Sequence, residues 1–204
     1  VMIELFVEVA PIFDFSLAVH LDVERSPPGS WIEGTLEILS ASNCWDDYVI
    51  EPDLPPGFII DMEEVNTDTI PRETLSINFS IQSHEHALAG PYDIIFRVAS
   101  KGSDIAQNIE KRLYLSEVYD LRLELLDAAK VELDPGDIHV IAFRITNHGN
   151  AADRAEIEIW SCEYISSWIR IYEKSTGSIE SGKNKTILLE VHIPSWNVTG
   201  GLYN

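Results

Sequence analysis

Apolar and polar residues alternate along most of this chain, and the alternation recurs in a second copy. Residues 13–19 alternate in the same way as residues 119–125, and residues 75–81 in the same way as residues 187–193. Such alternation is typical of half-buried β-strands, whose successive side chains face opposite sides of a sheet. No stretch shows a sustained period of 3.6 residues. The pattern therefore predicts an all-β fold.

Six landmarks recur in the same order at offsets of about 106 to 112 residues, which indicates an internal duplication. Besides the two strand patterns, the matched segments are 28–30 with 135–137, 36–43 with 143–150, 57–60 with 167–170, and 90–93 with 201–204. Short strands separated by turns at this spacing are typical of β-sandwiches of about 100 residues. The sequence predicts two such sandwiches in tandem.

The predicted domains are an immunoglobulin-like sandwich over residues 12–118 and a second over residues 119–204. Residues 1–11 are expected to be the terminal strand of a preceding repeat or a donor strand. The second sandwich is expected to be incomplete at its C-terminus, because residues 203–204 match the beginning of the strand that starts at Tyr92. Two explanations stay open: the chain is a fragment, or the segment from Val1 to Val9 fills the open edge of another copy by strand exchange.

Three motifs carry a family resemblance. They are the Pro-Gly-Asp turn at residues 135–137, the sequence Phe-Arg-Ile-Thr-Asn-His-Gly-Asn at 143–150 and the late Gly-x-Tyr strand. Together they resemble the immunoglobulin-like modules associated with α-galactosidases, which also occur in tandem in large archaeal cell-surface proteins. The first repeat departs from the pattern, with Ser-Ala-Ser-Asn at residues 40–43. These motifs are turns and core positions, so the resemblance implies a fold and no particular chemistry.

Charge is the strongest compositional bias, with 34 acidic residues against 14 basic ones and a formal net charge of −20. A chain of this sign repels nucleic acid and anionic lipid, so neither is a predicted partner. Solubility at a crowded surface and bridging by divalent cations both fit the charge. No apolar run reaches the roughly 18 residues of a membrane span, so none is predicted in this fragment.

Cys44 and Cys162 fall one in each proposed repeat, far from any second cysteine. We expect both to remain thiols, because a disulfide framework needs at least two cysteines in each domain. Neither a zinc site nor a cofactor is predicted. Tyr92 and Tyr203 each follow a glycine by two residues before a late strand, which predicts a tyrosine corner in each repeat.

Three Asn-x-Ser/Thr sequons are candidate glycosylation sites, at Asn78, Asn184 and Asn197. Asn78 alternates with the inward Ile77 and Phe79, so its side chain should face water. The other two asparagines lie beside predicted turns and should also be exposed. Glycosylation at these sites agrees with an extracellular or cell-surface location.

Exposed tryptophans could hold a sugar ring. Trp160, which alternates outward after two isoleucines, and Trp196 are the candidate contacts, whereas Trp168 matches Phe58 and is expected in the core. An acidic cluster offers oxygen ligands of the kind that calcium binds, but it lacks the ordered Asp-x-Asp-x-Asp-Gly spacing, so no metal site is predicted. The candidate ligands are Asp61, Glu63, Glu64 and Asp68.

The chain lacks the nucleophile elbow, the phosphate-binding loop, the His-Glu-x-x-His motif and the dinucleotide fingerprint. We therefore expect a protein that is not an enzyme. The favoured function is a structural repeat of a secreted or cell-surface sheath, surface-layer or filament protein, which gives a stiff rod and contacts neighbouring repeats or copies of itself. The alternative is a carbohydrate-binding or accessory module of a secreted glycosidase, with a surface glycan as ligand.

Overall fold

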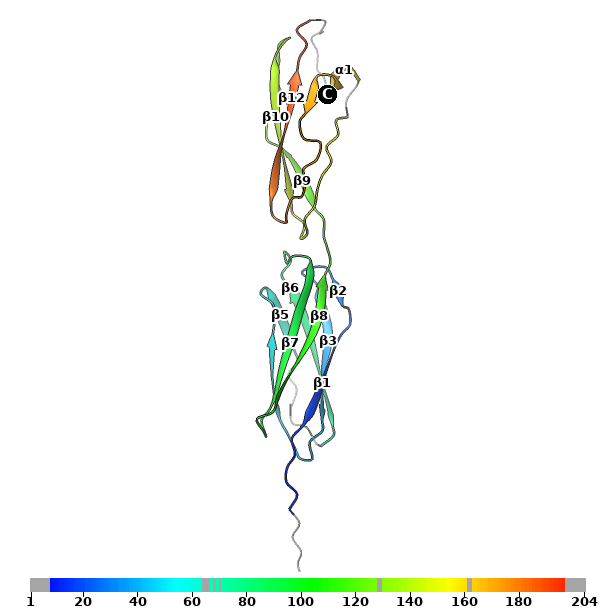
Figure 1. The fold of residues 1–204 in the computed structure, drawn as a ribbon, viewed down its shortest axis with the longest axis vertical. Coiled ribbons are helices and arrows are strands. Elements are labelled where there is room, and N and C mark those ends of the chain that lie inside the picture. Colours follow the sequence, from blue (N-terminus) through cyan, green and yellow to red (C-terminus); the bar gives the residue numbers. More distant parts are fainter. Residues whose placement is uncertain are drawn as a thin grey trace, which may run out of the picture. The chain divides into compact units, whose positions relative to one another are not determined.

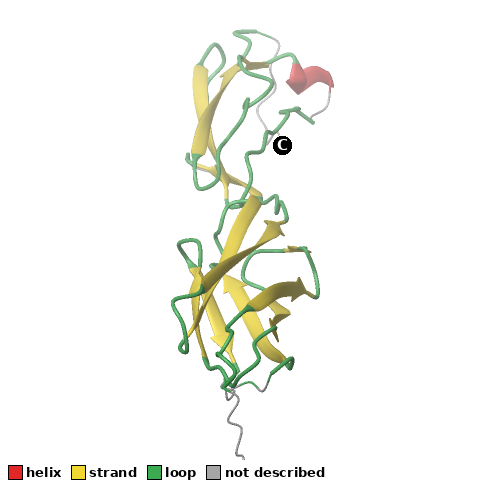
Figure 2. Cartoon of the chain, turned by 60° about the horizontal axis from the view of Figure 1, so that its bottom comes forward, coloured by secondary structure: helices red, strands yellow, loops and turns green. Residues whose placement is uncertain are grey.

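A computed structural model describes residues 8–63, 67, 69, 71–127, 130–160 and 163–196. The chain forms two compact units, Val1–Ser116 and Glu117–Asn204. Strands and connecting loops make up nearly all of each unit (Figure 2), which confirms the all-β prediction. The described helix is α1, Glu163–Ser166. A single turn is too short to produce a helical period in the sequence.

Eight strands form two four-stranded sheets in the first unit (Figure 1). The first sheet has the order β1 (Phe15–Leu21), β3 (Trp31–Ser40), β6 (Thr74–Ser83), β5 (Phe58–Met62). The second has the order β2 (Arg25–Ser26), β8 (Ala106–Leu115), β7 (Gly90–Ser100), β4 (Tyr48–Asp53). Neighbouring strands are antiparallel except β2 and β8, which are parallel.

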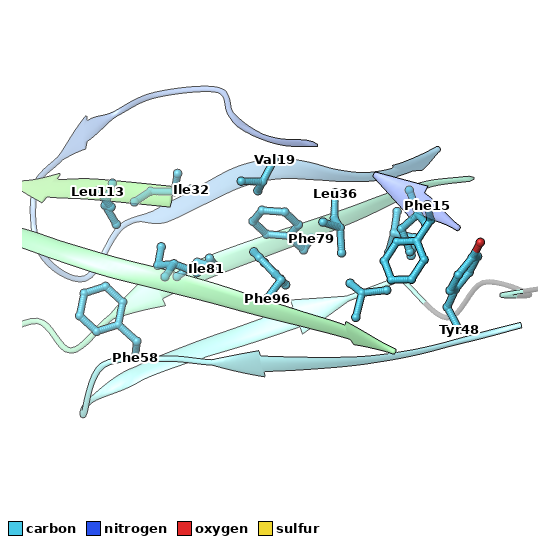
Figure 3. Packing of buried hydrophobic residues seen from close by; sticks show 14 of the residues in the cluster. Phe15, Val19, Ile32, Leu36, Tyr48, Phe58, Phe79, Ile81, Phe96 and Leu113 are labelled. Carbon is cyan, nitrogen blue, oxygen red and sulfur yellow. The ribbon is translucent and has the colours of Figure 1, made fainter. Parts of the chain in front are cut away.

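One hydrophobic core joins the two sheets of the first unit, as in a β-sandwich (Figure 3). Alternate residues of β6 and β7 are buried in it, and the rings of Phe79 and Phe96 meet with centroids 4.9 Å apart. Ile77 and Ile81 point into the same core, whereas Asn78 between them is exposed. The predicted phase of this strand is therefore confirmed.

Two turn features of the sequence also have the expected geometry. The hydroxyl of Tyr92 donates a hydrogen bond of 2.9 Å to the carbonyl oxygen of Leu88, which confirms this tyrosine corner. Tyr203 lies outside the described residues. Gly29 and Gly136, the glycines of the two Pro-Gly turns, have φ values of 77° and 94°. A side chain rarely tolerates this left-handed region, so the turns require glycine there.

The second unit has one four-stranded sheet among its described residues (Figure 1). Its order is β11 (Ile169–Ile171), β12 (Asn184–His192), β10 (Ile138–Asn147), β9 (Leu121–Leu125), and neighbouring strands are antiparallel. Leu123 pairs with Ile145 as Leu17 pairs with Ile38 in the first unit. Ile38 and Ile145 thus hold matching positions relative to their neighbouring strands, as predicted.

One predicted correspondence between the units is wrong by two residues. Leu36 pairs with Ile77, and Phe143, the predicted counterpart of Leu36, pairs with Ile187. Ile187 therefore corresponds to Ile77, whereas the sequence comparison matched it with Leu75. A shift of two residues leaves every side chain on its own face of the sheet, so alternation alone does not reveal it.

Cys44 is a half-buried free thiol, and its Sγ lies 3.8 Å from the carbonyl oxygen of Ile12. Cys162 falls outside the described residues. In the part of the chain that the structure describes, no helix is long and apolar enough to cross a membrane.

Candidate functional site

The described sequon asparagines are both on the surface. Asn78 accepts a 3.3 Å hydrogen bond from the Thr35 hydroxyl and donates a 3.0 Å bond to Glu63. Asn184 begins β12, and its exposed side chain forms no hydrogen bond with another described residue. Exposure is confirmed for these two sites, and Asn197 lies outside the described residues. Asn184 is the more accessible acceptor, because a glycan on Asn78 has to displace side-chain contacts.

The acidic cluster is only partly described. Asp61 and Glu63 are exposed, and Glu63 accepts the bond from Asn78. Glu64 and Asp68 lie outside the described residues. Among the residues that are described, no three histidine, cysteine, aspartate or glutamate side chains converge as metal ligands.

An open hollow of about 990 Å³ lies in the second unit. Its apolar lining includes Ile157, Ile159, Trp168 and Ile169, and its charged lining includes Arg170. It lies between residues 156–160 and strand β11. Half-buried and exposed residues alternate along residues 156–160. Ile157 packs against the core cluster of Ile145, Ile179 and Ile187 and also lines the hollow.

The hollow contains one of the two predicted sugar-contact tryptophans. Trp160 lines it with 90% of its surface exposed, whereas Trp196 is exposed but is not part of the lining. Trp168, at 6% exposure, forms a buried wall, as predicted from its match with Phe58. The structure therefore brings Trp160 and Trp168 together and leaves Trp196 apart.

Charged groups border the hollow at the β11–β12 edge. The Arg170 guanidinium lies 5.9 Å from the centroid of the Tyr172 ring. Hydrogen bonds with the Tyr172 hydroxyl and with the His192 ring hold the pKa of Glu190 below its usual range. The Nε2 atom of His192 lies 2.9 Å from a Glu190 carboxylate oxygen. Arg170 adds a smaller lowering effect. Glu190 therefore stays ionised below the usual carboxylate range.

Two asparagines at equivalent places form a backbone clamp that the sequence analysis did not identify. The side-chain oxygen of Asn43 accepts a 2.7 Å bond from the Ile12 backbone N–H, and the backbone N–H of Asn43 donates a 3.1 Å bond to the Ile12 carbonyl. Asn150 does the same with Val118, at 2.7 and 3.0 Å. The available signal was that asparagine is the final residue of both turn sequences, Ser-Ala-Ser-Asn and Asn-His-Gly-Asn.

Comparison with known protein families and with curated proteins finds no match for this chain. Among solved structures, it has some similarity to a protein of unknown function from Porphyromonas gingivalis W83. The sequence identity is 12%, the aligned region covers 86% of this chain and 83% of that chain, and the TM-score is 0.36. A similarity at this level carries no inference about fold or function.

Proposed function

We propose that the chain is a non-enzymatic structural repeat of a secreted or cell-surface protein. In this proposal its two units are immunoglobulin-like sandwiches in tandem, of the α-galactosidase-associated type that the sequence resembles. Their role is to give stiffness and to contact neighbouring repeats or other copies. Exchange of the segment from Val1 to Val9 between copies is one route for such contacts.

The recurrence of the asparagine clamp is the main support for this proposal. Asn43 with Ile12 and Asn150 with Val118 make the same pair of hydrogen bonds, with the same polarity and nearly the same lengths. Two residues after Ile12 and Val118, a second pair of backbone bonds also corresponds. Ala41 donates to the Asp14 carbonyl at 2.8 Å, and His148 donates to the Asp120 carbonyl at 2.7 Å. Stacked copies of one folding unit are the usual construction of repeat proteins.

Surface properties support a location outside the cell. The two described sequons are exposed, as a glycan requires. The formal charge of −20 favours solubility and opposes binding to nucleic acid.

The test is to label cells that carry the gene with antibodies raised against this chain. Labelling of intact cells, removable by brief external protease treatment, is the expected result. A cytoplasmic protein labelled only after permeabilisation serves as the control. Labelling that needs permeabilisation would overturn the proposal.

A carbohydrate-binding module is the second candidate, favoured by the exposed Trp160 at the hollow. Aromatic side chains with one free face can stack on sugar rings, and Arg170 and Lys174 line the same hollow. Under this alternative, Trp160→Ala should abolish the retardation of the chain in gels that contain a bound polysaccharide. Trp45→Ala is the matched control, because Trp45 is exposed in the other unit. Equal retardation of both variants would remove this candidate.

A further inference from the structure

The sheet that the two units have in common presents one face to solvent in each of them. The order β1-β3-β6-β5 of the first unit is repeated as β9-β10-β12-β11 in the second. In β3 every second residue is buried, and the residues between them point away from the core. In β10 and β12, Ile145 and Ile187 are buried, so their neighbours Arg144 and Leu188 point away from the core. We call these two solvent-facing surfaces the outer faces.

Two positions on the outer faces carry opposite charges in the two units. The first position lies on β3 and β10. Ile38 and Ile145 hold matching positions, so Glu37 corresponds to Arg144. Both side chains are half-buried. An acid of the first unit is thus replaced by a base in the second.

The second position lies on the edge strands β5 and β11. The register of β6 and β12 makes Glu190 the counterpart of Ser80. Asp61 pairs with Ser80, and Arg170 pairs with Glu190, so Asp61 corresponds to Arg170. Both of these charged side chains are exposed, and Arg170 lies over the ring of Tyr172. An acid is again replaced by a base.

The two acids have the same spacing as the two arginines. Glu37 and Asp61 lie beside residues 76 and 80 of β6, whereas Arg144 and Arg170 lie beside residues 186 and 190 of β12. Four residues of a strand span about 13 Å. Because the spacing is equal, the two outer faces can pack face to face with both acids opposite both arginines at once.

The other charges on the outer faces differ in the same direction. Among the described residues of β1, β3, β6 and β5, none is lysine or arginine, so the outer face of the first unit is acidic. The outer face of the second unit has a third arginine, Arg122, beside the acids Glu124 and Glu190. Arg144 lies 3.4 Å from Glu124, but an exposed ion pair contributes little, so this arginine can turn to an acid of a partner.

Exposed apolar side chains accompany the charges on both outer faces. Trp31 and Ile59 lie in one row across the first face, and each is at least half exposed. Ile138, Val140 and Leu188 are exposed on the second face. Burial of such surface against a partner is favourable, and complementary charges then decide which partner fits.

We propose that the outer face of the first unit of one copy docks on the outer face of the second unit of another copy, with Glu37 and Asp61 opposite Arg144 and Arg170. Two like faces do not dock, because acids would meet acids or arginines would meet arginines. A contact between unlike faces can join many copies in succession. This inference rests on the proposed repeat function and names the surfaces through which copies meet.

The sequons lie on the same faces. Asn78 is on β6 between the rows of Glu37 and Asp61, and Asn184 is at the margin of the partner face, at the start of β12. A glycan on Asn78 would hold the two faces apart. Docking is therefore expected of chains in which Asn78 is unmodified, and the experiment uses protein made without glycosylation.

Sedimentation velocity of the whole chain over a range of concentrations tests the contact. The average mass of the natural chain should rise with concentration. An acid-reversed chain, Glu37→Arg with Asp61→Arg, and a base-reversed chain, Arg144→Glu with Arg170→Glu, should each self-associate at least about tenfold more weakly, because like charges then meet. An equimolar mixture of the two reversed chains should associate again, because each then offers the charges that the other lacks.

A matched control separates this contact from a general effect of net charge. Asp53→Arg with Asp104→Arg changes the net charge as much as the acid-reversed chain does, at two exposed residues outside both outer faces. This control should associate no more weakly than the natural chain. Circular dichroism checks that each variant keeps its strands. If a double variant unfolds, the single changes Asp61→Arg and Arg170→Glu at exposed positions replace it.

A natural chain that sediments as a single copy at every concentration would overturn the docking contact. So would association that neither reversal weakens, or a mixture of the reversed chains that fails to associate. None of these results affects the surface labelling that tests the repeat function. Labelling that requires permeabilised cells overturns the repeat function instead, so the two failures are distinguishable.

Discussion

Asn150→Ala should destabilise the second unit by more than Asn43→Ala destabilises the first, although each removes the same side-chain hydrogen bond of the clamp. Asn150 is 4% exposed, and its side chain accepts the 2.7 Å bond from the Val118 amide. Asn43 accepts an equally short bond from Ile12, but this bond lies at the exposed surface. The Val118 bond is partly buried, so water replaces the lost acceptor there less easily than at the exposed Ile12 bond.

The expected free-energy losses follow from this difference in burial. A hydrogen bond contributes about 1 kcal/mol net, and a buried donor left without a partner costs a further 1–3 kcal/mol or so. Asn150→Ala should therefore lower the unfolding free energy of its unit by about 2 kcal/mol, and Asn43→Ala by less than about 1 kcal/mol. With a urea dependence near 1 kcal/mol per molar, the midpoint for the second unit should fall by about 2 M.

Urea unfolding followed by tryptophan fluorescence measures the second unit selectively. Trp168 is buried there, whereas Trp31 and Trp45 of the first unit are already exposed and change little on unfolding. Residue-resolved hydrogen exchange gives the matching value for the first unit. An equal loss in both variants, or a larger loss for Asn43→Ala, would refute the argument that burial decides the strength of the clamp.

Three further results are expected. Phe96→Ala should cost the first unit about 3–5 kcal/mol in calorimetry, because the fully buried ring packs against Phe79; a cost below about 1 kcal/mol would contradict this. Asp93 has a lowered pKa, chiefly through its hydrogen bond with Arg112, so its contribution to stability is present above the unfolded-state pKa and fades as pH falls through the folded-state value. Arg112→Gln should raise the Asp93 pKa towards its ordinary range in an NMR titration, and an unchanged value would contradict the assignment. The Asn184→Gln variant should lack the mass of one glycan relative to the native glycoprotein, and a glycan mass retained in full would show that Asn184 is unused.

The alternation of residues predicted the first unit well because its consequence is local. A period of two places Ile77 and Phe79 on one face of a strand and Asn78 on the other, whichever strand lies next to it. The same local logic predicted the tyrosine corner at Tyr92, where the hydroxyl reaches a carbonyl only four residues upstream.

The candidate site was predicted only in part. The exposure of Trp160 followed from its place in an extended segment, and the burial of Trp168 followed from its match with Phe58. The approach of Arg170 and Lys174 to the same hollow did not follow, because the strand β11 and the loop after it meet residues 156–160 only in the folded unit. Neighbours in space that are distant in sequence leave no local pattern.

The sequence by itself determined the all-β class and the face on which most apolar residues of the first unit lie, since each depends on short-range alternation. The tertiary structure alone decided the pairing of Phe143 with Ile187 and the partners of each asparagine clamp. It also decided that residues 156–160 meet strand β11 around an open hollow. Strand register and burial depend on which distant segments pack together, and a shift of two residues preserves the alternation completely.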